Sequence, residues 1–112
     1  MRQDARKAAV AAYKERTAEP GLYALTCTPS GERWVGGAPD LSTIENRLRF
    51  ALRHASTPHR SLAAAARAHG EPAFAFEVLE RIEEEDASPE LIAALLKSRL
   101  QHWRETLGAT AI

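Results

Sequence analysis

The chain has 112 residues, with 15 basic and 15 acidic side chains and a formal net charge of zero. That length predicts one domain with one core, and the balanced charge excludes a chain that is basic throughout. A single cysteine, Cys27, excludes a disulfide framework and a multi-cysteine zinc site.

The first half of the chain predicts a helix, a hairpin and another helix. Residues 4–17 are rich in Ala, Lys, Arg and Glu, which favour a helix that ends before Pro20 and Gly21. Strands are expected over 22–27 and 33–36, joined by the turn residues 28–31. Ser42 and Glu45 have the spacing of a capping box, so a helix is expected over 42–53.

The second half predicts a helix, a strand and a final helix. A helix is expected over 61–69, with Gly70 as its C-cap. Alternating apolar residues from Phe74 onward favour a strand with one buried face. Ser88 and Pro89 are typical of a helix start, and Gly108 of its end. The last helix carries one apolar stripe, formed by Ile92, Leu96, Leu100, Trp103 and Leu107.

These elements predict an α+β fold in which helices flank a small three-stranded antiparallel sheet. We expect a single domain over 1–112, with an N-terminal helix in 1–19 and a core over 20–108. No apolar run resembles a signal peptide or is long enough to cross a membrane. The expected setting is therefore soluble and cytoplasmic, with no membrane partner.

Charge is segregated along the chain although the total is zero. Residues 46–70 contain five arginines and three histidines but no carboxylate, whereas residues 71–90 contain eight carboxylates and one arginine. A carboxylate-free stretch over two helices favours a phosphate-binding face. The same arginines would also suit separate solvated helix faces, and composition alone does not choose between these two interpretations.

Two short motifs on either side of the expected hairpin turn resemble those of the GIY-YIG nuclease family. They are Gly21-Leu22-Tyr23 and Trp34-Val35-Gly36. The tract NRLRFAL resembles the family's arginine-bearing helix, and ARAHGEPAFAFEVLERI resembles its third strand, reached through a glycine. The resemblance extends over about residues 8–108, and the order of the four elements carries more weight than any one of them.

The resemblance implies cleavage of DNA phosphodiesters with one divalent metal ion, Mg²⁺ or Mn²⁺. It implies catalytic roles for Tyr23, Trp34 and Arg47, with Trp34 in place of a second tyrosine. The side chains expected to contact nucleic acid, with DNA favoured, are Arg49, Arg53, His54, His59 and Arg60. His54 and His59 are expected in the loop between two helices and not as metal ligands.

The resemblance places the metal-binding glutamate on the last helix, where this chain has Leu100. No carboxylate lies within one helical turn before it, so we predict no metal ligand. The leading interpretation is a nuclease-like domain that binds nucleic acid with an incomplete catalytic site. Two alternatives are an active endonuclease that takes its carboxylate from Glu77 or Glu90, and a protein-interaction module that keeps only the scaffold.

Overall fold

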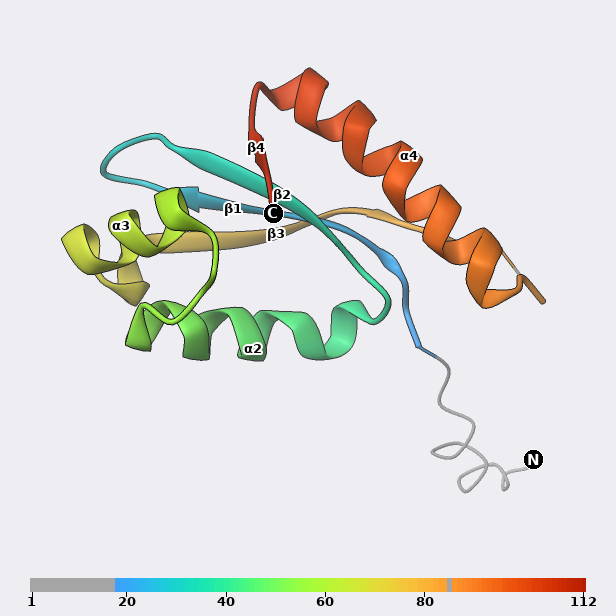
Figure 1. Ribbon diagram of the computed structural model, residues 1–112, viewed down its shortest axis with the longest axis horizontal. Coiled ribbons are helices and arrows are strands. Elements are labelled where there is room, and N and C mark those ends of the chain that lie inside the picture. The colour runs from blue at the N-terminus through green and yellow to red at the C-terminus, as the bar shows by residue number, and fades with distance from the viewer. Residues whose placement is uncertain (1–17, 85) are drawn as a thin grey trace.

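The computed structural model describes residues 18–84 and 86–112, so the helix predicted over 4–17 lies outside the described residues. A four-stranded sheet lies between α4 on one face and α2 with α3 on the other (Figure 1). The strands are β1 (Gly21–Cys27), β2 (Arg33–Ala38), β3 (Phe74–Arg81) and β4 (Thr110–Ala111). The helices are α2 (Leu41–His54), α3 (Arg60–His69) and α4 (Pro89–Leu107), with a short 3-10 turn η1 (Glu71–Ala73) before β3.

The sheet has the order β3-β1-β2-β4, with β1 antiparallel to both of its neighbours. The predicted α+β class is confirmed, and so are the three predicted strands, which are β1, β2 and β3. The prediction of a wholly antiparallel three-stranded sheet is wrong, because β4 adds a fourth strand parallel to β2. Two residues are too few to show a period-2 pattern, so the sequence did not reveal this strand.

The last helix begins and ends as its local signals predict. Ser88 accepts a hydrogen bond from the Leu91 amide at 3.1 Å, Pro89 follows it, and Gly108 closes the helix with φ of 61°. The start of α2 differs from the predicted capping box. Asp40 is the N-cap and accepts from the Ser42 amide at 3.1 Å, while Glu45 bonds to Arg49 and not to the helix start.

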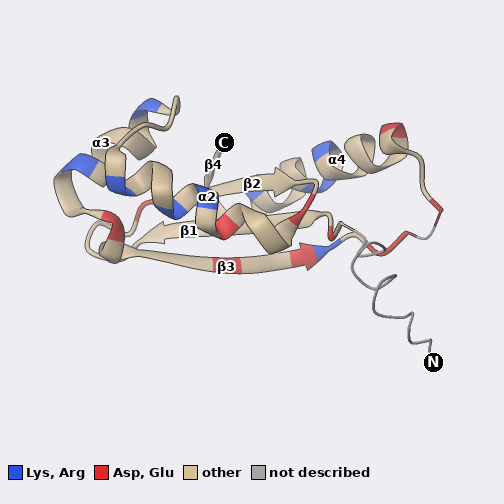
Figure 2. Ribbon diagram, turned by 90° about the horizontal axis from the view of Figure 1, so that it is seen from below, with Lys and Arg blue, Asp and Glu red and all other residues tan. Residues whose placement is uncertain are grey.

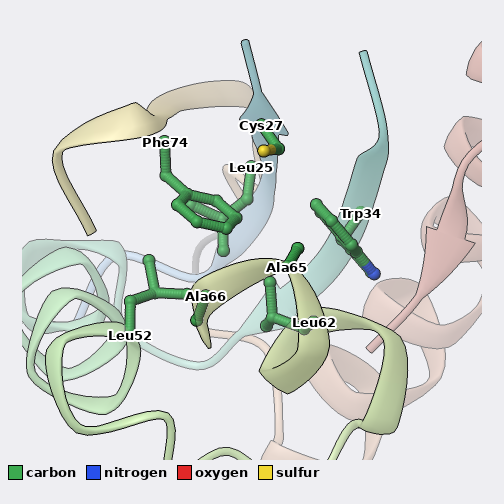
Figure 3. Close-up of a cluster of buried hydrophobic side chains, with 8 residues drawn as sticks. All are labelled: Leu25, Cys27, Trp34, Leu52, Leu62, Ala65, Ala66 and Phe74. Atoms are coloured by element: carbon green, nitrogen blue, oxygen red, sulfur yellow. The ribbon is translucent and has the colours of Figure 1, made fainter. Parts of the chain in front are cut away.

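One face of the sheet carries the main core. The pairing of Tyr23 with Gly36 and of Leu25 with Trp34 places these side chains on the face that α2 and α3 cover. Side chains from five elements, β1, β2, α2, α3 and β3, meet there, as Figure 3 shows. The cluster consists of Leu25, Cys27, Trp34, Leu52, Leu62, Ala65, Ala66 and Phe74. Tyr23 forms a second cluster with Ala38 and Leu41 beneath the start of α2.

The opposite face of the sheet carries α4. A Cβ at Gly37 would make ordinary contact with Leu96, which shows how closely this helix approaches β2. Its apolar stripe faces the sheet but is only partly covered, and Leu100 is half-buried. Glu80 links β3 to α4 by accepting from Trp103 Nε1 at 2.9 Å and Arg99 Nε at 2.8 Å. These hydrogen bonds hold the pKa of the Glu80 carboxyl below its usual range, and the one from Trp103 has the larger effect.

Within residues 18–84 and 86–112, no helix is long and apolar enough to cross a lipid bilayer.

Candidate functional site

Tyr23 and Gly36 are adjacent partners on β1 and β2, and the tyrosine ring occupies the space that the glycine leaves. A Cβ on Gly36 would overlap the Tyr23 hydroxyl and lie 2.6 Å from Cζ. On its other side, the Tyr23 ring stacks on Phe76 with centroids 5.7 Å apart. Only 5% of Tyr23 is exposed. The glycine of the second motif, Gly36, therefore leaves room for the tyrosine of the first motif, Tyr23.

Gly21 also owes its identity to close packing. A Cβ there would overlap the carbonyl oxygen of Glu80 and lie 2.5 Å from Leu41 Cδ1. The strand β3 and the start of α2 thus approach this backbone more closely than any side chain would allow. Leu41 packs in the same cluster as Tyr23, so Gly21 lets α2 sit next to the tyrosine.

Arg47 lies on α2 with an exposed side chain, close enough for its charge to act on Tyr23. Burial raises the pKa of the Tyr23 hydroxyl, and the positive charge of Arg47 opposes that rise. The net pKa is above the ordinary value of 10.0. At neutral pH the hydroxyl therefore keeps its proton and can donate a hydrogen bond.

We expect this raised pKa to appear in an alkaline titration. The chain has two tyrosines, so the variant Tyr13→Phe isolates Tyr23, whose absorbance change should occur above pH 10. Adding Arg47→Ala should move this absorbance change to still higher pH, because the charge that lowers the Tyr23 pKa is lost. Because the folded-state pKa is the higher one, the linked stability is present below the unfolded-state value and is lost as pH rises through the folded value. An ordinary tyrosine titration in Tyr13→Phe would contradict this.

Trp34, for which the family resemblance implies a catalytic role, does not join this site. Its exposed fraction is 1%, and its indole Nε1 donates to Ser61 Oγ on α3 at 2.9 Å. The ring tilts against Phe74 with centroids 5.9 Å apart. Trp34 and Tyr23 share a sheet face, but α3 covers Trp34. In this position the tryptophan is a core residue.

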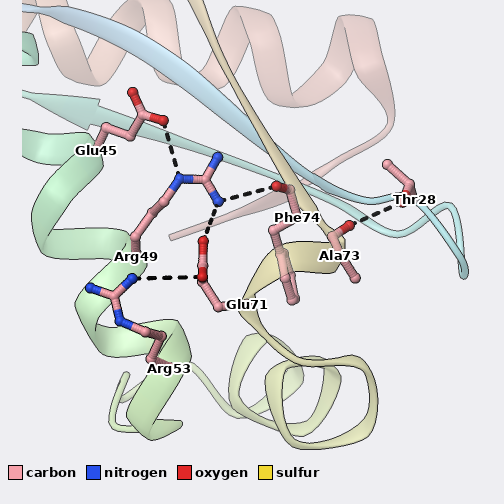
Figure 4. Close-up of polar contacts among 7 residues, drawn as sticks. All are labelled: Thr28, Glu45, Arg49, Arg53, Glu71, Ala73 and Phe74. Atoms are coloured by element: carbon pink, nitrogen blue, oxygen red, sulfur yellow. Dashed lines mark hydrogen bonds and ion pairs between the residues drawn. The ribbon is translucent and has the colours of Figure 1, made fainter.

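Arg49 is held by internal contacts, in contrast to its predicted role in binding nucleic acid (Figure 4). Its Nη1 donates to Glu71 at 2.7 Å and to the Phe74 carbonyl at 3.2 Å, and its Nε donates to Glu45 at 3.2 Å. Burial lowers the pKa of Arg49, but the two carboxylates outweigh that effect and the pKa is raised. Arg49 therefore ties α2 to the start of β3.

Arg53 also contacts Glu71, at 3.6 Å, but its side chain is 54% exposed. His54 is the last residue of α2, and its ring lies 4.4 Å from that of Phe50, centroid to centroid. His59 is the N-cap of α3, and Arg60 is its first residue. These four residues, which were predicted to contact nucleic acid, are all exposed at the α2–α3 end of the molecule.

Figure 2 shows where the charged residues lie. Blue segments follow α2 and α3 and also occur on α4, and α2 carries some red as well, whereas red segments gather along β3 and the loop that leads to α4. A hollow lies beside that acidic loop and is lined by Pro20, Ile82, Glu83, Glu84, Ile92 and Leu96, among others. Its carboxylates would repel a phosphate, and it includes none of the predicted site residues.

The carboxylates considered as metal ligands lie apart from Tyr23. Within residues 18–84 and 86–112, no group of three or more His, Cys, Asp or Glu side chains is placed to hold a divalent metal ion. Glu77 pairs with Ala24 on β1, and its side chain therefore points away from the face that carries Tyr23. Glu90 lies in the first turn of α4, the helix on that opposite face. The two carboxylates considered as alternative ligands thus do not lie beside Tyr23.

By sequence, the chain matches no protein-family model and no curated protein. Two solved structures resemble it. The catalytic domain of homing endonuclease I-TevI aligns with a TM-score of 0.67 and 23% identity, over 83% of this chain and 97% of that one. A glutamate-to-alanine mutant of the I-TevI catalytic domain aligns with a TM-score of 0.66 and 23% identity, over 80% and 84%. The chain has the GIY-YIG nuclease fold.

The GIY-YIG fold explains the spacing of the two motifs that suggested it. Across β1 and β2, the tyrosine of the first motif faces the glycine of the second. Three features of the site were not predicted: Gly36 as the space for the Tyr23 hydroxyl, Ser61 as the partner of Trp34, and Glu71 as the partner of Arg49. All three depend on residues that meet through the fold, so nothing in the local sequence marks them.

Proposed function

We propose that this domain of GIY-YIG fold binds nucleic acid by holding a phosphodiester between Arg47 and the Tyr23 hydroxyl, and that its catalytic site is incomplete. The observation that carries the proposal is the position of the Tyr23 hydroxyl beside Gly36, where the positive charge of Arg47 acts on it. Exposed Arg53, His54, His59 and Arg60 extend the basic surface along α2 and α3. DNA is the expected partner, by analogy with the family.

The two groups suit a phosphate in complementary ways. A guanidinium donates two parallel hydrogen bonds to the non-bridging oxygens and remains charged at any physiological pH. The protonated tyrosine donates one more hydrogen bond, or orients a water molecule. Because the Tyr23 pKa is raised, the hydroxyl holds its proton near neutral pH. Its proposed role is therefore to position the phosphate and not to act as a phenolate base.

Efficient hydrolysis would require further charge compensation. In-line displacement at a phosphodiester builds negative charge on the phosphoryl and leaving oxygens, which metal ions commonly stabilise. Among the described residues, no group of three or more His, Cys, Asp or Glu side chains is placed to hold Mg²⁺ or Mn²⁺, and Leu100 presents only carbon. The alternative, a metal-dependent endonuclease, is favoured by the two structural neighbours, both described as catalytic domains of an endonuclease.

Arg47→Ala should weaken binding to a labelled DNA duplex and reduce the slope of log K against log salt by about 1, as for one lost phosphate contact. Fluorescence anisotropy across a salt series measures both quantities. Arg104→Ala is the matched control, because it removes one exposed arginine from α4 on the other side of the sheet. It should change the slope much less.

Plasmid nicking with Mg²⁺ or Mn²⁺ separates binding from cleavage. We expect little or no nicking. Nicking that disappears in both Tyr23→Phe and Arg47→Ala would instead establish the endonuclease. If the protein failed to bind DNA even at low salt, a protein-interaction module on the same scaffold would be the better interpretation.

A further inference from the structure

Phe50 is an exposed aromatic residue in the middle of α2. Within residues 18–84 and 86–112, Phe50 at 58% and Leu91 at 45% are the exposed large apolar side chains. Phe50 follows the buried Leu41 by nine residues, which is about two and a half turns of helix. It therefore lies directly opposite the helix face that packs on the sheet. Packing within the part of the chain that the structure describes does not account for a phenylalanine there.

The surroundings of Phe50 are polar and basic. Its ring lies against that of His54, with centroids 4.4 Å apart and an angle of 50° between the planes. Arg47 and Arg53 lie three residues to either side, and both side chains are exposed. The nearest carboxylates in sequence are Glu45 and Glu71, and both bind Arg49. The ring is thus flanked by cationic groups, without a free carboxylate between residues 46 and 70.

We propose that Phe50, with His54 beside it, is a stacking platform for an unpaired nucleobase, so that the preferred ligand is single-stranded nucleic acid. This inference rests on the proposed function, because it places the base next to the phosphate held by Arg47. Arg47 and Phe50 are three positions apart on α2, a rise of about 4.5 Å. Side chains at that spacing are neighbours on the surface of a helix.

The geometry favours a base over a protein partner. A protein-docking face needs a contiguous apolar area at its centre. Here one ring stands among Thr43, Asn46, Arg47, Arg53 and His54 on the outer side of the helix. An aromatic ring with arginines around it matches the two needs of a single strand, stacking for the base and cations for the phosphates. Bases in a duplex are already stacked on their neighbours, so a duplex would use the arginines alone.

Binding of a fluorescein-labelled twelve-nucleotide oligothymidine tests the proposal by anisotropy at low salt. Wild-type protein should bind it more tightly than a duplex of equal length. Phe50→Ala should weaken single-strand binding about tenfold, with little effect on the duplex. The salt slope should stay the same, because the ring carries no charge. Phe50→Trp should retain binding, and Leu91→Ala, which removes the other exposed apolar side chain, should bind as wild type does.

A second probe removes the bases and keeps the phosphates. On an oligonucleotide of abasic residues, wild type and Phe50→Ala should bind equally. Equal affinity of these two proteins for oligothymidine would overturn the platform and leave the proposed function standing. Failure of wild type to bind any of the oligonucleotides would overturn both. A change of oligomeric state in Phe50→Ala, seen by light scattering, with oligothymidine binding unchanged, would assign Phe50 to a contact between copies and overturn the platform.

Discussion

Trp34→Ala should lower the free energy of unfolding by about 3–5 kcal/mol, the usual cost of removing a large aromatic side chain from a core. Trp34 is 1% exposed and packs against side chains from β1, α3 and β3. Its loss leaves a cavity that these rigid elements cannot close. Urea denaturation followed by circular dichroism measures the change.

Trp103→Ala is the control for Trp34→Ala. Trp103 is also a tryptophan with an indole hydrogen bond, to Glu80, but it lies on α4 and is only partly buried. Removing the Trp103 side chain should lower the free energy of unfolding clearly less than removing that of Trp34. If Trp34→Ala instead kept its stability and lost nucleic-acid binding, the tryptophan would line the binding surface after all, as the family resemblance first suggested.

Gly36→Ala should both destabilise the protein and disturb the site. The added methyl group would overlap the Tyr23 hydroxyl, and the ring is confined by Phe76 and the start of α2. We expect a loss of about 1–3 kcal/mol, the usual cost of overpacking a core. Thermal or urea denaturation measures it, and the tyrosine titration of the Tyr13→Phe background should shift because the hydroxyl must move.

The next residue provides a matched control on the same strand. Gly37 points to the opposite face, where an added Cβ would lie 3.5 Å from Leu22 Cδ1 and from Leu96 Cβ, an ordinary contact distance. Gly37→Ala should therefore be nearly neutral, or slightly stabilising because it restricts the unfolded chain. Equal losses in the two variants would show that the strand, and not the space for Tyr23, requires glycine.

The helices and strands could be predicted because their signals are local. Ser88, Pro89 and Gly108 mark both ends of α4, and Gly70 marks the end of α3. Where two local signals compete, prediction fails: Asp40 caps α2 in preference to Ser42, two residues further on. The strand β4 escaped prediction because its two residues take their conformation from pairing with β2.

The site could be predicted only in part. Tyr23 and Arg47 come together because each lies on an element that the sequence specifies well. The burial of Trp34 depends on Ser61, 27 residues away, and the internal role of Arg49 depends on Glu71, 22 residues away. Sequence position gives no measure of such contacts. Phe50, in contrast, could have been noticed from its helical spacing to Leu41.

The central position of β1 has a consequence for how the protein folds. The hairpin of β1 and β2 closes over a five-residue connection, from Thr28 to Glu32, whereas the pairing of Tyr23 with Val78 on β3 spans α2 and α3 in the sequence. Contacts so distant in sequence slow folding, because the chain loses entropy before they form. During synthesis, the motif-bearing hairpin leaves the ribosome well before β3. We therefore expect the packing around Tyr23 to be completed late in folding, when β3 pairs with β1 and Phe76 stacks on the Tyr23 ring.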